Sequence, residues 1–258
     1  MLRRIFRRAV PPSAKRAVAN LVAGSFAGAC IRSFNRHTIK HRNSLIRIDH
    51  PRVSNRMVGQ LFWRIYERAE LDQIAHFLPR DADVLEVGGS SGITTLLIAS
   101  LLSKERTIIS VEADPELSAL ALENCGLNGY SDRATFISAA VDYEHEHVIF
   151  RRDAQSVVGK IENSGLSGNS ITVPTVTLSH LANQYNLRDY TLVMDIEGAE
   201  WEVLRHGDLR GAKRILAELH EIRTAERNLS VPELVHEFEK AGFQIVNRDA
   251  HCVVLDRV

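Results

Sequence analysis

Residues 84–92, VLEVGGSSG, place a short apolar strand pattern directly before a glycine-rich turn, and an apolar helix pattern follows over residues 94–102. Glycine suits a position where the backbone turns sharply, or where a ligand approaches without meeting a Cβ atom. In an open α/β sheet, such a turn lies at the carboxyl edge of the sheet, where ligands bind. The segment therefore predicts a mainly parallel sheet with a ligand site at this edge.

Strands and helices alternate from residue 57 onward. A polar cluster at residues 163–170 interrupts this order and predicts an inserted hairpin or loop within residues 141–176. Apolar spacing predicts helices over residues 57–78, 94–102, 115–125, 178–185, 199–205 and 232–241, and strands over residues 84–87, 107–112, 134–140, 190–195, 214–219, 243–246 and 252–256. We therefore expect a Rossmann-like, doubly wound α/β fold with a mainly parallel seven-stranded sheet that ends in an antiparallel pair.

The amino-terminal part differs in charge and periodicity. Residues 1–56 contain thirteen Lys or Arg residues and one acidic residue, a formal charge of +12, whereas residues 57–258 carry −12. We therefore expect a basic, helical extension (1–56) and an α/β domain (57–258). The first ten residues, MLRRIFRRAV, have the composition of a helix that lies on an anionic membrane, and a solvated or partner-bound basic tail is the equal alternative. The lack of an aromatic stacking pattern speaks against nucleic acid as the partner.

The three cysteines and the hydropathy pattern bear on the cellular compartment. The cysteines, at positions 30, 125 and 252, form no C-x-x-C pair, so we expect neither a disulfide framework nor a zinc site. The sequence contains no run of about 18 apolar residues, so it predicts no membrane-spanning helix. Residues 17–31 resemble the apolar part of a signal peptide, but they are rich in Ala and Gly and follow Pro11 and Pro12. We expect a cytoplasmic protein that contacts a membrane at most through its basic end.

The glycine spacing in the turn distinguishes two kinds of cofactor loop. The turn lacks the G-x-G-x-x-G pattern of dinucleotide sites, and together with Glu86 it reads E-x-G-x-x-x-G, the pattern of S-adenosylmethionine-binding loops. The next strand ends in an acid, at the position that accepts hydrogen bonds from a ribose diol. The alternatives are a glycine turn that only packs a helix on a strand, and an acid placed at the amino end of a helix. We expect the cofactor to bind at Glu86, Gly88, Gly89, Ser90, Gly92 and Glu112.

Further segments share their text with one enzyme family. They are YERAE (66–70), VLEVGGSSGITT (84–95), VEADPE (111–116), ENCGLNG (123–129), SAAV (138–141), VPTVTLSHL (173–181), MDIEGAEWEVLRHG (194–207) and AELHE (217–221). Over residues 57–222 the chain resembles the FkbM family of S-adenosylmethionine-dependent methyltransferases. The resemblance implies cofactor contacts at Ala140 and Asp195, and O-methylation of a hydroxyl on a carbohydrate, a lipid-linked glycan or a related natural product. The chain departs from the family at Ser179, where an Asp is usual, so no function of that acid carries over.

Two acids and a histidine follow the fourth and fifth predicted strands. Methyl transfer to an alcohol requires alignment of the reacting atoms and removal of the hydroxyl proton. We expect His220 or Asp195 to be the base, narrowly in that order, with Glu197 in the same catalytic set. The acids could instead hold the base and the acceptor hydroxyls, bind the α-amino group of the cofactor, or cap the next helix. Their spacing together with His220 matches no recognised metal signature, so we assign no metal ligand.

Two other function classes stay open from the sequence. An NAD(P)-dependent oxidoreductase would also use Glu112, but the missing G-x-G-x-x-G pattern argues against it. A non-catalytic scaffold with this fold would not need the retained acids and glycines. We expect a small-molecule or glycan acceptor and no nucleic acid. Variable loops such as residues 141–176, where His145 and His147 are expected at the surface, would form the acceptor pocket.

Overall fold

The computed structural model describes residues 24–152, 159–162, 170–223 and 228–258. Two compact units make up the chain, Met1–Tyr66 and Glu67–Val258. The first unit extends beyond residue 56, where the charge pattern predicts the boundary. The segment MLRRIFRRAV, which we expect at a membrane surface or in a basic tail, lies outside the described residues.

The described part of the first unit has a packed structure. It contains α3 (Ser25–Asn35), β1 (Thr38–His41), β2 (Ser44–Arg47) and α4 (Asn55–Phe62), and β1 pairs antiparallel with β2. The two helices approach closely, since a Cβ atom added at Gly28 would lie 1.6 Å from the carbonyl oxygen of Asn55. Arg32 donates hydrogen bonds to the carbonyl oxygens of Ile48 and Val53. The apolar periodicity of this region is weak and does not predict these elements. The packing of the unit depends in part on the close contact at Gly28 and on the bonds from Arg32 to the backbone, which apolar spacing does not reveal.

The helix predicted over residues 57–78 is wrong in one respect. The structure contains two helices here, α4 and α5 (Arg68–Phe77), separated by a turn. Arg64 and Glu67 adopt left-handed backbone angles in this turn, with φ values of 56° and 40°. Such angles cannot continue a right-handed helix. The apolar spacing runs on through the turn, so periodicity alone does not reveal the break.

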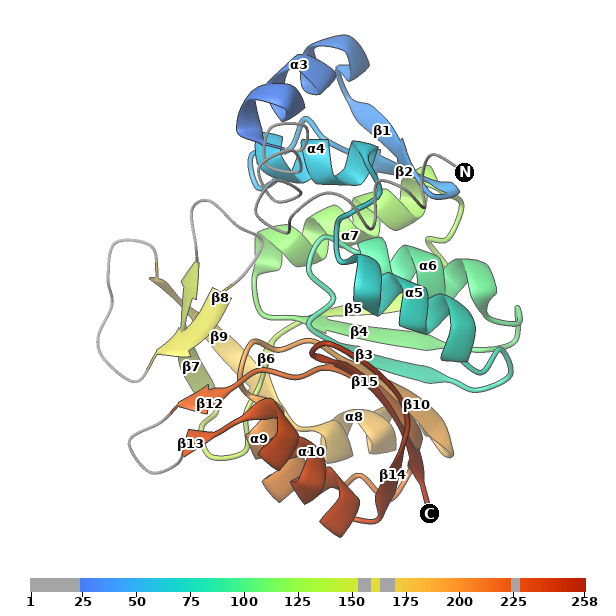
Figure 1. Ribbon diagram of the computed structural model, residues 1–258, viewed down its shortest axis with the longest axis vertical. Coiled ribbons are helices and arrows are strands. Elements are labelled where there is room, and N and C mark those ends of the chain that lie inside the picture. Colours follow the sequence, from blue (N-terminus) through green and yellow to red (C-terminus); the bar gives the residue numbers. More distant parts are fainter. Residues whose placement is uncertain (1–23, 153–158, 163–169, 224–227) are drawn as a thin grey trace, which may run out of the picture. The chain divides into compact units, whose positions relative to one another are not determined.

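The second unit is built on a sheet of seven strands within the described residues, in the order β14-β15-β11-β10-β3-β4-β5 (Figure 1). The strands are β3 (Val84–Val87), β4 (Ile108–Glu112), β5 (Ala134–Ser138), β10 (Tyr190–Met194), β11 (Ala212–Glu218), β14 (Phe243–Asp249) and β15 (Cys252–Arg257). Neighbours from β11 to β5 are parallel, and β15 runs antiparallel to both β11 and β14. This arrangement confirms the predicted fold class. The chain order reverses at β3, which lies between β4 and β10, so the site predicted from the sequence lies at a topological switch point.

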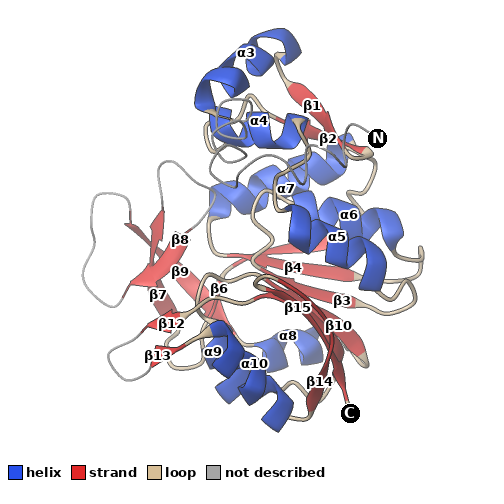
Figure 2. Cartoon of the chain, viewed as in Figure 1, coloured by secondary structure: helices blue, strands red, loops and turns tan. Residues whose placement is uncertain are grey.

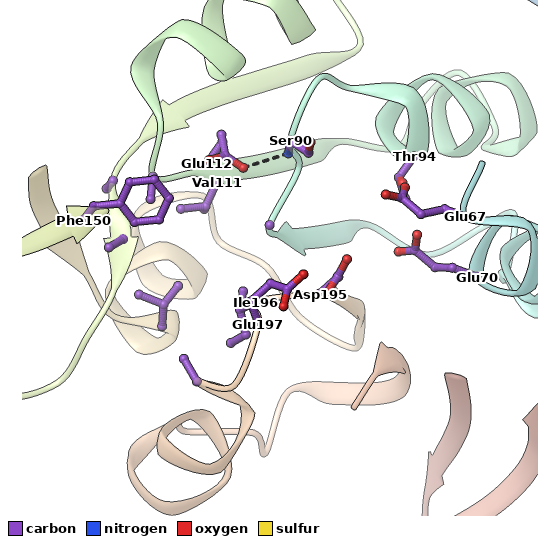
Figure 3. Close-up of a pocket in the computed structure, with 16 residues that line it drawn as sticks. Glu67, Glu70, Ser90, Thr94, Val111, Glu112, Phe150, Asp195, Ile196 and Glu197 are labelled. Atoms are coloured by element: carbon purple, nitrogen blue, oxygen red, sulfur yellow. Dashed lines mark hydrogen bonds between the residues drawn. The ribbon is translucent and has the colours of Figure 1, made fainter. Parts of the chain in front are cut away.

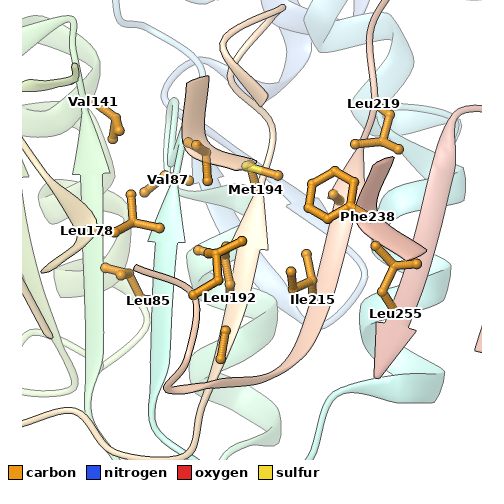
Figure 4. Packing of buried hydrophobic residues seen from close by; sticks show 14 of the residues in the cluster. Leu85, Val87, Val141, Leu178, Leu192, Met194, Ile215, Leu219, Phe238 and Leu255 are labelled. Carbon is orange, nitrogen blue, oxygen red and sulfur yellow. The ribbon is translucent and has the colours of Figure 1, made fainter. Parts of the chain in front are cut away.

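Helices cover both faces of this sheet (Figure 2). Every residue of β3, β4 and β10 is buried, as expected for parallel strands enclosed on both faces. On one face Leu85 packs in a cluster with Leu178 and Phe238 from two of the helices (Figure 4). On the other face Ile74 of α5 and Ile98 of α6 belong to a second cluster. The helices besides α5 are α6 (Ile93–Leu101), α7 (Pro115–Leu127), α8 (Leu178–Gln184), α9 (Glu200–His206) and α10 (Val231–Lys240).

A smaller sheet replaces the regular alternation between residues 140 and 176. Its strands are β6 (Ala140–Val141), β7 (His147–Arg152), β8 (Gly159–Glu162) and β9 (Ser170–Val176), in the order β6-β9-β7-β8. Strand β7 pairs antiparallel with both β8 and β9, which confirms the inserted hairpin. Phe150 of β7 is buried in a small apolar cluster with Ala140 and Val173. A short ribbon of β12 (Ile222–Arg223) and β13 (Asn228–Leu229) follows the main-sheet strand β11.

Candidate active site

A pocket lies at the carboxyl ends of β3, β4 and β10 (Figure 3). It encloses about 870 Å³ of space, part of it open to solvent, which is within the range of small-molecule sites. Five of its lining residues are acidic, and no Lys or Arg lines it among the described residues. The lining residues are Glu67, Glu70, Gly88, Ser90, Thr94, Val111, Glu112, Ala113, Ala139, Ala140, Val141, Phe150, Asp195, Ile196, Glu197 and Ala199.

The glycine turn after β3 brings the backbone close to the end of β10. Gly88 has a φ of 90°, and a Cβ atom added to it would lie 1.7 Å from the carbonyl oxygen of Asp195. The structure therefore requires glycine at this position, both for the positive φ angle and for the close approach of the turn to Asp195. Gly89 and Gly92 do not line the pocket. A Cβ atom at Gly92 would lie 2.7 Å from that of Ala121, so this glycine allows close packing of the turn against α7.

Glu112 lies at the end of β4 and is 7% exposed. Its Oε2 accepts a hydrogen bond from the backbone N–H of Ser90 at 2.8 Å, and its Oε1 accepts one from that of Asp114 at 2.7 Å. Burial raises the pKa of Glu112 to about 7, although these two bonds act in the opposite direction. Asp114 is the residue that caps α7, by accepting a bond from the N–H of Glu116. Glu112 therefore joins the glycine turn to β4 and presents its carboxylate to the pocket.

Glu86 has a different position from the one its motif suggests. It is 1% exposed within β3 and does not line the pocket. Thr95 donates a hydrogen bond of 2.6 Å to its Oε2. Burial raises the pKa of Glu86, while the nearby hydroxyl groups of Ser110 and Thr95 lower it. Glu86 therefore links β3 to α6, the helix that follows the glycine turn.

The ends of β10 and β11 bring together the predicted catalytic residues. Nε2 of His220 lies 4.0 Å from Oδ1 of Asp195 and 3.6 Å from Oε2 of Glu197. Its Nδ1 lies 2.8 Å from Oε1 of Glu200, whose side chain is fully buried, and this contact fixes the orientation of the ring. One carboxylate oxygen each of Asp195 and Glu197 and one ring nitrogen of His220 all lie within 4.8 Å of one another. Asp195 and Glu197 line the pocket, whereas His220 lies behind them and does not line it.

Burial and neighbouring charges perturb the protonation of this cluster. Burial lowers the pKa of His220, but the hydrogen bond to Glu200 and the charges of Glu200, Glu197 and Asp195 together raise it to about 9. Burial raises the pKa of Asp195 to about 8, with further contributions from nearby acids. Groups this close titrate as a unit. Near neutral pH the cluster therefore holds protons more tightly than isolated side chains would.

The alternative function of Asp195 and Glu197 as helix caps is wrong. Helix α9 begins at Glu200, its amino-terminal cap is Ala199, and no side chain caps it. Glu197 instead has a left-handed φ of 53° in the turn between β10 and α9. Both acids are therefore available to a ligand. Ser179, where the family usually has Asp, lies outside the pocket, and its Oγ is 3.1 Å from Oγ1 of Thr177.

Two acids of the pocket, Glu67 and Glu70, are not predicted from the sequence. They line it from the start of α5. Both belong to the segment YERAE, which carries part of the family resemblance, but no helix periodicity distinguishes a pocket acid from a surface acid. Phe150 was also missed, because its strand belongs to the inserted sheet.

The pocket fits S-adenosylmethionine in its volume and in the charge of its lining. Glu112 offers a buried carboxylate for the two ribose hydroxyls, and Ala113, Ala140 and Phe150 provide apolar surface beside it for the adenine ring. Glu67 and Glu70 lie on the opposite side of the glycine turn (Figure 3). The negative lining suits a ligand that carries a sulfonium and an ammonium group.

No curated protein sequence matches the chain significantly. Similar solved structures include a ribosomal protein L11 methylase from Lactobacillus delbrueckii subsp. bulgaricus (14% identity, 74% of this chain and 77% of that chain, TM-score 0.44). Others are a methyltransferase from Geobacter sulfurreducens (15%, 75% and 79%, TM-score 0.43) and TrmK from M. capricolum in complex with S-adenosyl-homocysteine (12%, 72% and 67%, TM-score 0.43).

The family assignment depends on sequence. Residues 86–245 match the Methyltransferase FkbM domain, which is more than half of the chain. The match includes the glycine turn, Glu112 and the Asp195–Glu197–His220 cluster, and it supports methyl transfer over hydride transfer to a nicotinamide. The chain belongs to the FkbM family and is an S-adenosylmethionine-dependent methyltransferase.

Proposed function

We propose that the enzyme transfers the methyl group to a hydroxyl oxygen of a neutral, hydroxyl-rich acceptor, such as a carbohydrate, a lipid-linked glycan or a related natural product. The observation that carries this proposal is the Asp195–Glu197–His220 cluster at the edge of the cofactor pocket. An alcohol must lose its proton as the new carbon–oxygen bond forms, so its methylation needs a proton acceptor beside the methyl group.

The arrangement of the cluster supports Asp195 as the group that meets the acceptor hydroxyl. Asp195 lines the pocket, and its Oδ1 is a buried atom without a hydrogen-bond partner. His220 lies behind it, with its ring held by Glu200. When bound, the cofactor supplies the electrophilic methyl group. Asp195 accepts the hydroxyl proton, and the charge of His220 stabilises the carboxylate form of Asp195 before transfer, as its lowering effect on the pKa of Asp195 indicates. This reverses the narrow preference for His220 as the base.

The charge of the pocket supports a neutral acceptor. Five acidic side chains and no basic ones line the pocket among the described residues, so this lining offers no cation to a phosphate group, whereas carboxyl oxygens accept hydrogen bonds from hydroxyls. This favours a glycan or small molecule over nucleic acid.

A screen of radiolabelled methyl uptake tests the acceptor class. Neutral sugars, lipid-linked glycans and polyhydroxylated natural products are compared with tRNA and with a protein mixture, using the wild-type enzyme and Asp195→Asn. We expect uptake into at least one neutral hydroxyl compound, with loss of that uptake in Asp195→Asn and unchanged binding of S-adenosylhomocysteine. Labelling confined to tRNA or protein would contradict the proposal.

We also propose that the basic amino-terminal segment contacts anionic membranes peripherally. Among the described residues, no helix is long and apolar enough to cross a bilayer. The support is the sequence of residues 1–16, in which six basic residues surround Leu2, Ile5 and Phe6. Flotation with anionic vesicles compares the full chain with a variant in which Arg3, Arg4, Arg7 and Arg8 are replaced by Glu. Equal recovery of both proteins with the vesicles would overturn this proposal.

A further inference from the structure

Glu70 is a buried acid without a neutralising partner. Its side chain extends from α5 into the pocket, and the residue is only 7% exposed. Within the described residues the structure records no hydrogen bond or ion pair for it. Buried carboxylates in folded proteins are nearly always paired or hydrogen-bonded, because desolvation of an isolated charge is costly. A group with these properties inside a ligand pocket indicates that the ligand provides the missing partner.

The charges around Glu70 define the sign of that partner. Burial raises the pKa of Glu70 well above its usual value, and the charges of Glu67, Asp195, Glu218 and Glu86 raise it further. Each of these neighbours is acidic. A cation that enters this end of the pocket would relieve their repulsion and stabilise the ionised form of Glu70.

The position of Glu70 in the pocket identifies the ligand group. Figure 3 shows Glu67 and Glu70 on one side of the glycine turn, and Glu112 and Phe150 on the other. A ligand with its ribose at Glu112 therefore extends its far end toward Glu70. In S-adenosylmethionine the far end is an α-amino acid, and its ammonium group provides three hydrogen-bond donors and a positive charge.

We propose that Glu70, assisted by Glu67 beside it, binds the α-ammonium group of the cofactor and so selects ligands that carry the amino-acid end. The inference rests on the cofactor of the enzyme and is independent of the acceptor. From the sequence, binding of the α-amino group of the cofactor is one alternative for Asp195 and Glu197. The proposal assigns this function to Glu70 of α5 instead. Those two acids already lie near His220, whereas the charged neighbours that most affect the pKa of Glu70 are all acidic.

Calorimetric titration with two ligands tests this assignment. S-adenosylhomocysteine contains the amino-acid end, and 5′-methylthioadenosine has the same adenosine and a thioether sulfur without it. We expect Glu70→Gln to weaken S-adenosylhomocysteine binding about tenfold to a hundredfold, because a charge-assisted hydrogen bond is lost. Binding of 5′-methylthioadenosine is expected to stay within about twofold of wild type, a change too small to reflect a lost hydrogen bond.

Two control variants separate this effect from other causes. Glu112→Gln removes the ribose contact and should weaken both ligands, and Glu116→Gln replaces an exposed acid on α7 and should weaken neither. An equal loss of both ligands in Glu70→Gln, or no loss of either, would overturn the proposal.

A measurement on the wild-type enzyme keeps the proposal testable if Glu70→Gln fails to fold. The des-amino analogue of S-adenosylhomocysteine lacks only the ammonium group, and we expect it to bind at least about tenfold more weakly than S-adenosylhomocysteine. Equal affinity of the two would contradict the proposal. Failure to methylate any hydroxyl acceptor would leave both binding results unchanged, so the two proposals fail separately.

Discussion

The Gly88→Ala substitution tests how strictly the structure of the cofactor turn limits this position. Alanine at a φ of 90° costs about 1–2 kcal/mol through its backbone conformation alone. Its Cβ atom would also lie 1.7 Å from the carbonyl oxygen of Asp195, so that residue or the turn must move by more than about 1 Å. Such a shift strains the bond from the N–H of Asp195 to the carbonyl of Val87. We expect a total loss of about 3–5 kcal/mol in the free energy of unfolding.

Gly129→Ala is the matched control. Gly129 also has a positive φ, 74°, but a Cβ atom there would meet nothing within 4 Å. It should therefore cost only the backbone term, about 1–2 kcal/mol. Urea denaturation followed by circular dichroism gives both free energies, and calorimetry gives the affinity for S-adenosylhomocysteine, which should fall only in Gly88→Ala. If the two variants lose the same stability and both bind the ligand normally, the close approach of Gly88 to Asp195 does not constrain the site.

Three further predictions concern the titrating groups. The folded-state pKa of Glu112, about 7, lies above its ordinary value of 4.5, so the ligand-free protein should lose stability as pH rises from about 4.5 to 7. Urea denaturation at pH 5 and pH 8 gives the loss in the free energy of unfolding between these pH values, and Glu112→Gln should make this loss smaller by up to about 3 kcal/mol. An equal loss in the wild-type protein and the variant would contradict this prediction. Turnover at saturating substrate should rise between pH 7 and 9, because Asp195 must lose its proton before it can accept one and its pKa is about 8; a flat profile would exclude Asp195 as the proton acceptor. Glu200→Gln should move the midpoint of that rise to higher pH, because without Glu200 the pKa of His220 falls and the ring keeps less of the charge that lowers the pKa of Asp195; an unchanged midpoint with normal ligand affinity would show that His220 is uncoupled from the reaction.

Short sequence patterns predict several strands of this structure and the glycine turn, because these features depend on neighbouring residues in the chain. The strand from Val84 to Val87 and the two closing strands follow from short apolar runs bounded by turn residues. The function of Gly88 follows from the need for a positive φ after a buried strand. Asp195 and His220 were identified individually, but their proximity depends on the pairing of β10 with β11, in which Met194 lies opposite Ala217.

Other features depend on contacts that local patterns do not encode. The break between α4 and α5 comes from two left-handed residues within a continuous apolar pattern. Glu70 lies between Ala69 and Leu71 on α5, and only the packed structure shows that its side chain enters a pocket. Glu86 shows the opposite case, because its motif suggests a cofactor contact while the structure buries it beneath the turn.

The proposed reaction is methyl transfer to oxygen at the Asp195 edge of the pocket. The most direct measurement is carbon NMR of the product formed from S-adenosylmethionine that carries a ¹³C-labelled methyl group, with an acceptor found in the uptake screen. We predict a single O-methyl resonance with the wild-type enzyme, and none with Asp195→Asn at unchanged S-adenosylhomocysteine affinity. A methyl resonance on nitrogen or sulfur, or an undiminished O-methyl signal with Asp195→Asn, would contradict the account.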